Sequence, residues 1–142
     1  MNIYLLDTNI ISEPTKSSPS ESVMNSIAEN FDHSCMCSVI WAEILTGIKC
    51  LADGKRKDAL LNYYLNTIQK AYEILPFDSF AASIYSDLVE RLKNKGNPLP
   101  KLDLMIAATA ISNNLILVTR NTADFEPIKE VSNLMTENWF EQ

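Results

Sequence analysis

The 142-residue sequence has few cysteines and a single histidine, and both shortages exclude kinds of site. An odd count of three cysteines, Cys35, Cys37 and Cys50, does not suit a disulfide framework, so we expect free thiols that behave as small buried hydrophobic side chains. With no second pair of Cys or His residues, a zinc site is not expected. His33 is the only histidine, which excludes most Ser/His/Asp and Cys/His catalytic schemes unless it takes part itself. Its position between a helix end and a strand predicts a surface residue.

Long apolar runs are missing too. No segment is long enough to span a bilayer. The N-terminus has no basic region and reaches Asp7 after a few apolar residues, so we expect no signal peptide. These features predict a cytoplasmic protein with no membrane partner. The length suits one domain, residues 1–142, and a hydrophobic fraction of 46% is ordinary for such a domain.

An excess of positive charge is also absent. Twelve Lys and Arg residues face eighteen Asp and Glu residues, which gives a net charge of −6. That is the wrong sign for binding nucleic acid through bulk charge. Either the substrate is not a polyanion, or a local basic patch, a metal ion or a partner supplies the positive field.

Short apolar runs alternate with segments of helical periodicity. We expect strands at 2–8, 34–38, 72–77 and 115–119, with an edge strand at 131–136. We expect helices at 19–31, 39–51, 55–68, 79–95 and 102–113, and loops at 96–100 and 121–127. The alternation predicts an α/β domain of three layers, in which helices flank a mostly parallel central sheet of four to five strands.

Four acidic residues fall near the carboxyl ends of the expected strands or the starts of the helices that follow. Asp7 ends the first strand, and Glu43 lies one turn into the helix after the second. Asp103 opens the Ala-rich helix, and Asp124 lies five residues beyond Thr119 at the end of the fourth strand. Ligands of parallel sheets gather outside the carboxyl ends of the strands. We therefore expect the four carboxylates to converge on one rim.

Acids gathered in this way need a counter-charge. Glu43 and Asp103 lie in apolar helical segments, where an unpaired carboxylate is costly. Two such charges roughly 4 Å apart repel by on the order of 4 kcal/mol at an effective dielectric near 20. A hard divalent cation such as Mg²⁺ relieves that repulsion, and it can activate water against a phosphodiester.

Capping is the competing interpretation for each acid taken alone. Asp103 can stabilise the positive end of its helix, and Asp7 can bond the amides of Thr8 and Asn9. Asp78 has the same chemistry, and we assign it as a helix cap. The pattern alone leaves both capping and a shared metal site open.

Most basic residues have the scattered spacing of solvated faces. Lys101 and Arg120 differ because they stand beside Asp103 and before Asp124. We name these two as candidates for contact with a substrate phosphate.

Four segments, LLDTNIIS, SVIWAEILTGI, LPKLDLMIAATA and LVTRNTADF, resemble in order and spacing the PIN-domain ribonucleases. They are closest to the VapC-type toxins of type II toxin–antitoxin pairs, and the resemblance covers essentially the whole chain. It implies a parallel sheet flanked by helices and an Mg²⁺- or Mn²⁺-dependent endoribonuclease. Such an enzyme cleaves RNA, for example tRNA or another structured RNA, through a metal-activated water.

The resemblance also assigns residue roles. The catalytic acids are Asp7, Glu43, Asp103 and Asp124. Asp7 and Asp103 are the expected metal ligands, with Glu43 and Asp124 as further candidates. The supporting polar residues are Thr8, Asn9, Ser38 and Asn121.

Family members usually form homodimers and bind a small antitoxin that inserts a basic residue, often Arg, into the acidic site. The resemblance therefore implies a homodimer and a hetero-oligomer with an antitoxin. Two alternatives remain, because nothing in the acids distinguishes RNA from DNA. The first is a DNA-directed or structure-specific nuclease of the same fold, and the second is a catalytically degenerate binding module.

Overall fold

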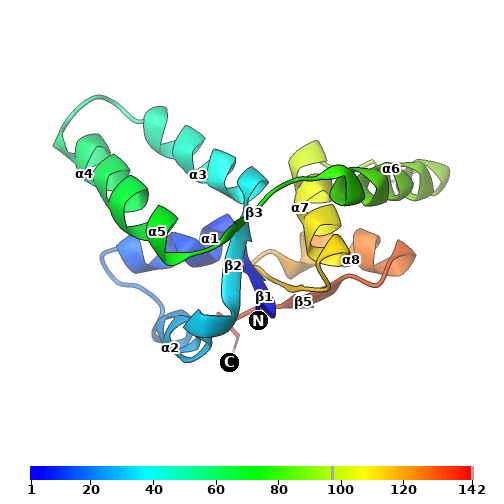
Figure 1. The fold of residues 1–142 in the computed structure, drawn as a ribbon, viewed down its shortest axis with the longest axis horizontal. Coiled ribbons are helices and arrows are strands. Elements are labelled where there is room, and N and C mark those ends of the chain that lie inside the picture. Colours follow the sequence, from blue (N-terminus) through cyan, green and yellow to red (C-terminus); the bar gives the residue numbers. More distant parts are fainter. Residues whose placement is uncertain (97, 142) are drawn as a thin grey trace.

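The computed structural model describes residues 1–96 and 98–141 and is built around a five-stranded sheet (Figure 1). The strands are β1 (Tyr4–Leu6), β2 (Ser34–Cys37), β3 (Ile74–Leu75), β4 (Ile116–Val118) and β5 (Met135–Glu137). Their order is β3-β2-β1-β4-β5, and every pairing is parallel. The chain starts in the middle of the sheet, extends it on one side to β3 and then on the other side to β5. The reversal places a topological switch point between β1 and β4, where such sheets bind ligands.

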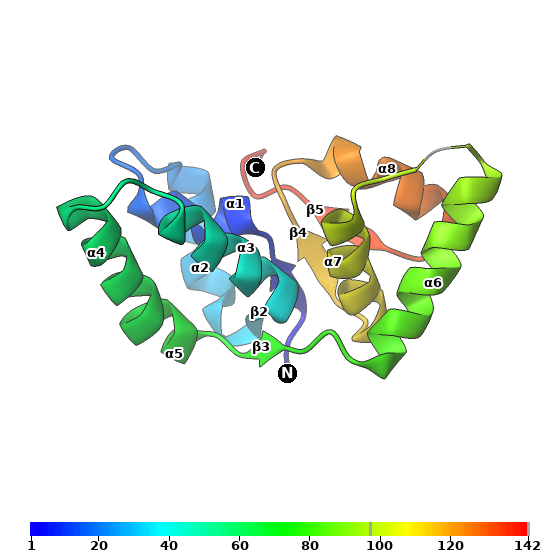
Figure 2. The ribbon, with the colours of Figure 1, turned by 90° about the horizontal axis from the view of Figure 1, so that it is seen from above.

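Helices cover both faces of this sheet. The helical segments are α1 (Thr8–Ile11), η1 (Glu13–Thr15), α2 (Glu21–Asn30), η2 (Phe31–His33), α3 (Ser38–Lys49), α4 (Lys55–Tyr63), the π-helical η3 (Tyr64–Ile68), α5 (Gln69–Ala71), α6 (Ser79–Asn94), α7 (Lys101–Ser112) and α8 (Thr122–Val131). Figure 2 shows α1 to α5 on one side of the sheet and α6 to α8 on the other. The three-layer α/β fold expected from the sequence is confirmed.

Two expected boundaries are wrong. Of the expected loop 121–127, residues 122–127 form the start of α8, although Pro127 lies inside the helix. Proline removes a helical hydrogen bond, but burial of Phe125 and Ile128 against the core offsets that loss. The second helix starts at Glu21 and not at Pro19, because the Ser20 side chain accepts the cap hydrogen bond from the Val23 amide at 3.3 Å.

The remaining boundaries are close to those expected. Asp78 caps α6 as assigned, accepting from the Ala81 amide at 3.0 Å. The edge strand pairs at 135–137, so it overlaps only the end of the predicted 131–136. Of the expected loop 96–100, Asn97 lies outside the described residues. Within the described ranges, no helix combines the length and apolar character needed to cross a membrane.

The cysteines are free, as expected, but only two of them are buried. Cys35 and Cys37 lie in β2 with no exposed surface. Burial raises the pKa of the Cys35 thiol to about 12 and that of Cys37 to about 11. Both therefore stay protonated and act as core side chains. Cys50 is exposed at the end of α3, which corrects the expectation that it is buried. His33 is exposed, as predicted.

Candidate active site

Asp7 lies at the switch point, directly after β1. Its backbone amide donates to the Val118 carbonyl at 2.9 Å, which holds it beside the end of β4. One carboxylate oxygen accepts from the Thr8 amide at 2.8 Å and so caps α1. The other accepts from the Thr119 hydroxyl at 2.8 Å, and not from the amide of Asn9. With only 8% of its surface exposed, Asp7 is the most buried of the four acids.

The other three acids reach the same rim from helices, Asp103 and Asp124 from first turns and Glu43 from the second turn of its helix. Glu43 lies in α3 and is partly buried, and its Oε1 accepts from the Thr8 hydroxyl at 3.3 Å. Asp103 lies in the first turn of α7 and is partly buried. Asp124 lies in the first turn of α8 and is exposed. The positive ends of α7 and α8 therefore face the rim.

Burial raises the pKa of three of these carboxyls, and repulsion from neighbouring acids raises the pKa of two of them further. For Asp7, burial is the cause, and it outweighs the hydrogen bonds from Thr119 and Thr8. For Glu43, burial raises the pKa most, followed by the charges of Asp7 and Asp103. For Asp103, burial again raises the pKa most, followed by the charges of Asp7 and Asp124. The fold thus brings all four acids within electrostatic reach of a neighbour in the set.

This donor set fits a hard divalent cation. Among residues 1–96 and 98–141, no salt bridge includes any of the four acids, so their charge is not balanced by a basic side chain. In the same ranges, no three Asp, Glu, His or Cys side chains lie close enough to share one ion. Mg²⁺ keeps several waters and is usually bound through one or two carboxylates. The spacing therefore suits an ion with few direct protein ligands.

A buried threonine, Thr119, organises the site, and its contact with Asp7 was not predicted from the sequence. The Thr119 hydroxyl donates to Asp7 and accepts from the Asn9 side-chain amide at 3.3 Å and the Asn121 backbone amide at 3.1 Å. Asn9 in turn accepts from the Arg120 amide at 3.0 Å. These bonds fix the turn after β4 against α1. The available signal was the position of Thr119 as the polar residue that ends an apolar strand.

The other predicted residues have different surroundings. Ser38 accepts from the Phe77 amide at 3.1 Å and so joins the start of α3 to the segment after β3. Lys101 is exposed at the start of α7 and lines a separate hollow beside α6. The Arg120 guanidinium lies 4.4 Å from the ring centre of Phe140, a cation–π contact beside the Thr119 turn. Their roles in binding and catalysis stay predictions.

In the metal-free protein, the raised pKa values give stability a pH dependence of definite sign. Each such carboxyl holds more protons in the folded than in the unfolded chain. The free energy of unfolding therefore falls as pH rises from the ordinary values of 3.8 and 4.5 through the raised values. We expect Tm in chelator to fall more between about pH 4 and about pH 7 in the wild type than in Asp7→Asn.

Thermal melts of both proteins at stepped pH measure this difference. Glu13, whose pKa is lowered mainly by its hydrogen bond with Lys16, acts in the opposite direction. It is present in both proteins, so the comparison reports on Asp7 together with the effect of its charge on Glu43 and Asp103. Parallel Tm curves would contradict the assigned pKa shift.

The sequence comparison decides the family. The PIN domain matches residues 4–131, which includes all four acids. The chain belongs to the PIN-domain family. A VapC ribonuclease of Sinorhizobium fredii is 34% identical over 127 residues, covering 87% of this chain and 91% of the relative. The tRNA(fMet)-specific endonuclease VapC of Shigella flexneri is 32% identical over 136 residues, covering 96% and 97%.

A solved structure supports the same grouping. This PIN domain superimposes on FitAcB from Neisseria gonorrhoeae with a TM-score of 0.89 at 30% identity, over 99% of this chain and 100% of the other. Both the sequence and the fold therefore place it among VapC- and FitB-type proteins.

Proposed function

We propose that this PIN domain is a metal-dependent endoribonuclease that serves as the toxin of a toxin–antitoxin pair. The observation that carries the proposal is the group of desolvated, mutually repelling carboxylates at the switch point, none of them in an ion pair within the described chain. Repulsion of this kind destabilises the free site and favours binding of a cation. The ribonuclease names of the relatives support the reaction class.

Asp7 and Asp103 would hold the ion. Glu43 and Asp124 would contact it through its bound waters, because no three carboxylates of the described residues lie close enough to share one ion. A bound Mg²⁺ or Mn²⁺ supplies Lewis acidity toward the phosphodiester and lowers the pKa of water. Thr119 and the Thr8 amide fix both oxygens of Asp7 in place. Because Glu43 accepts from Thr8 through Oε1, its Oε2 is free of that bond and can accept a proton from the attacking water. Its raised pKa brings it nearer to the neutral pH at which a general base works well.

RNA is the proposed substrate because both sequence relatives are named for action on RNA. One of them is named for a transfer RNA, which makes a folded tRNA the first substrate to try. The acids cannot select the sugar, since each would bind an ion and a phosphate that RNA and DNA share. Contacts to the 2′-hydroxyl must make that distinction.

Competition between labelled substrates tests this proposal. RNA and DNA strands of one sequence, together with a folded tRNA, are incubated with the protein and Mg²⁺. We expect cleavage within the RNA strands and none in DNA. Equal cleavage of DNA would favour the structure-specific alternative. No cleavage at all, with no rise in Tm on addition of Mn²⁺, would favour the degenerate binding module.

The proposed partner is a small antitoxin that places a basic side chain among the four acids, and a second copy of the chain completes a homodimer. The acidic rim and the net charge of −6 favour a basic partner, and solved structural relatives include VapBC assemblies. Co-expression with the product of the neighbouring reading frame, followed by measurement of residual cleavage, tests this part. Undiminished cleavage in the purified complex would count against it.

A further inference from the structure

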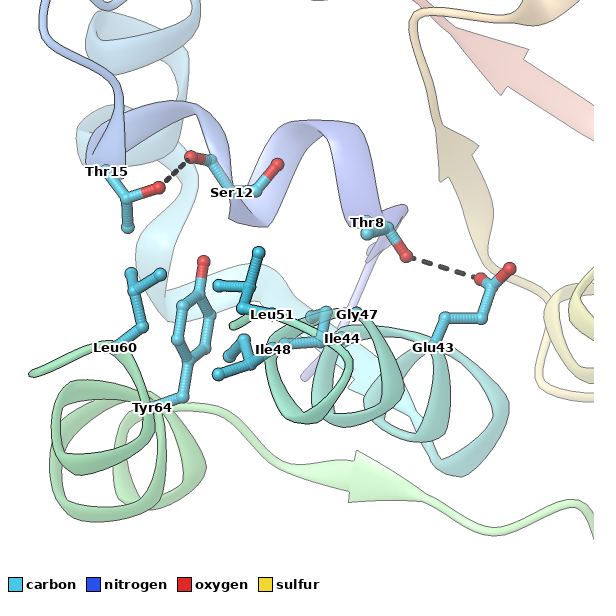
Figure 3. Close-up of a pocket in the computed structure, with 10 residues that line it drawn as sticks. All are labelled: Thr8, Ser12, Thr15, Glu43, Ile44, Gly47, Ile48, Leu51, Leu60 and Tyr64. Carbon is cyan, nitrogen blue, oxygen red and sulfur yellow. Dashed lines mark hydrogen bonds between the residues drawn. The ribbon is translucent and has the colours of Figure 1, made fainter. Parts of the chain in front are cut away.

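A groove leads away from the acidic site along α3. One wall is formed by α1 and η1, and the other by α3 and α4 (Figure 3). Thr8 and Glu43 stand at one end of the groove, and Thr15 and Tyr64 stand at the other. The hollow has a volume of about 190 Å³, and its apolar lining comes from Ile44, Ile48, Leu51 and Leu60. It thus begins at a candidate catalytic acid and continues past it.

Gly47 keeps the middle of this groove open. It lies inside α3 and lines the hollow, and a Cβ added to it would meet no atom within 4 Å. Glycine within a helix is less stable than alanine. Since no neighbour crowds this position, packing does not require glycine here. The space that a side chain would fill belongs to the groove.

At its far end the groove adjoins a polar pocket. This pocket has a volume of about 700 Å³ and is lined by Ser12, Thr15, Lys16, Ser17, Ser18 and Arg56. Ser12 and Thr15 line both hollows, so the two lie side by side. Lys16 is paired with Glu13 at 2.7 Å, whereas Arg56 is in no salt bridge formed by the described residues. The pocket therefore presents hydroxyl groups and an uncompensated guanidinium.

We propose that the RNA strand cut at the acidic site continues through this groove and that Arg56 binds a second phosphate of the same strand. The inference rests on the proposed function. Five residues of α3 separate Glu43 from Ile48, about 7.5 Å along the helix axis, and the groove continues beyond Ile48. A strand must therefore extend past the cleaved nucleotide to reach Arg56.

The chemistry of the far pocket suits a phosphate. A guanidinium binds two phosphate oxygens through parallel N–H groups. The serine hydroxyls are further donors, whereas the Thr15 hydroxyl already donates to the Ser12 carbonyl at 2.7 Å. Phosphate contacts position a strand without reading its sequence. Arg56 thus supplies part of the local positive field that a chain of net charge −6 needs to hold a polyanion.

Arg56→Gln tests the inference, with Lys55→Gln as its matched control. Both residues are exposed and lie in the first turn of α4, but Lys55 lines neither hollow. The substrates are a long single-stranded RNA and short oligonucleotides that extend from the cleavage point on one side only. For the long RNA we expect Arg56→Gln to raise KM about tenfold with kcat unchanged, as for loss of a contact made equally in the ground and transition states.

The control variant and the short substrates show which results would contradict the proposal. Lys55→Gln is expected to leave KM within about twofold, and Arg56→Gln to leave the shortest substrates unaffected. Binding of long RNA without cleavage is measured in an Asp7→Asn background. We expect Arg56→Gln, and not Lys55→Gln, to reduce the slope of log binding constant against log salt concentration by about 0.7 in magnitude. Equal effects of the two substitutions, or an equal effect on short and long RNA, would overturn the assignment.

Filling the groove gives an independent test. Gly47→Leu places a side chain in open space, and Gly47→Ala adds a single methyl group at the same position. We expect Gly47→Leu to raise KM for long RNA and Gly47→Ala to change it little. If both Gly47→Leu and Arg56→Gln leave KM unchanged, the groove is not an RNA path, and a protein segment is its better occupant. A wild type that cleaves no RNA would overturn the proposed function as well, whereas cleavage that ignores Arg56 and Gly47 overturns only this inference.

Discussion

Replacing Asp7 by Asn is expected to lower kcat/KM for RNA by on the order of 10³-fold or more while the fold is retained. Asp7 is the most buried acid of the site, and its charge acts on both Glu43 and Asp103. Asparagine keeps the shape of the side chain and one oxygen to accept from the Thr8 amide. It removes the negative charge that would hold the cation.

The stability of this variant follows from two opposing changes. The Thr119 hydroxyl oxygen already accepts hydrogen bonds from Asn9 and Asn121. If the side-chain NH2 of the new asparagine faces Thr119, it therefore finds no free acceptor there. The lost hydrogen bond costs about 1 kcal/mol. Removal of a buried charge that repels its neighbours offsets this cost. We therefore expect a change in unfolding free energy of no more than about 1 kcal/mol at neutral pH in chelator.

Cleavage kinetics and thermal melts of the purified variant measure both effects. Asp78→Asn is the matched control, because it makes the same substitution at a helix cap where Asn also serves. The control should keep full activity. Mg²⁺-dependent cleavage at the wild-type rate by the Asp7→Asn protein would refute the assignment of the active site.

Removal of divalent metal is expected to abolish cleavage, and addition of Mg²⁺ or Mn²⁺ to restore it. The same ions should stabilise the folded protein, because they bind the gathered carboxylates and have no comparable site in the unfolded chain. At a concentration one hundred times Kd, the gain is about 2.7 kcal/mol. The rise in Tm should be largest near neutral pH, where carboxyls with raised pKa are ionised.

Chelation followed by titration of each ion checks this expectation by cleavage and by Tm. The Asp7→Asn and Asp103→Asn variants should show a smaller rise in Tm or none, whereas Asp78→Asn should match the wild type. Full cleavage after exhaustive chelation would exclude a metal-dependent reaction. An equal rise in all three variants would place the ion elsewhere on the protein.

The order of the strands and of the longer helices, and the four acids, could be predicted from the sequence, because each depends on local pattern. Apolar runs that end at Asp7 and Thr119 indicate strands, apolar periodicity indicates α3, and an apolar, Ala-rich segment indicates α7. The short helices α1 and η1 were not predicted. The strand-end rule then places the acids on one rim. Segment 121–127 was predicted wrongly because Pro127 is a strong local signal against a helix. Burial of Phe125 in the assembled core decides otherwise.

Three features of the site needed the tertiary structure. The hydrogen bond from Thr119 to Asp7 joins residues 112 positions apart, and no local pattern encodes that contact. The raised pKa values depend on how much solvent each carboxyl loses and on which charges become its neighbours. The position of the groove beside Glu43, and of the adjoining pocket beside Arg56, depends on how η1 and α4 pack across α3.

The sequence by itself determined a low content of cysteine and histidine, an acidic net charge, an alternating α/β pattern and four acids at strand or helix ends. These properties depend on composition and short-range spacing. Only the tertiary structure decided which acids are desolvated, which hydroxyl holds Asp7 and where an unpaired arginine lies relative to the site. Solvation and charge–charge energies depend on distances in space, and folding sets those distances between residues far apart in the chain.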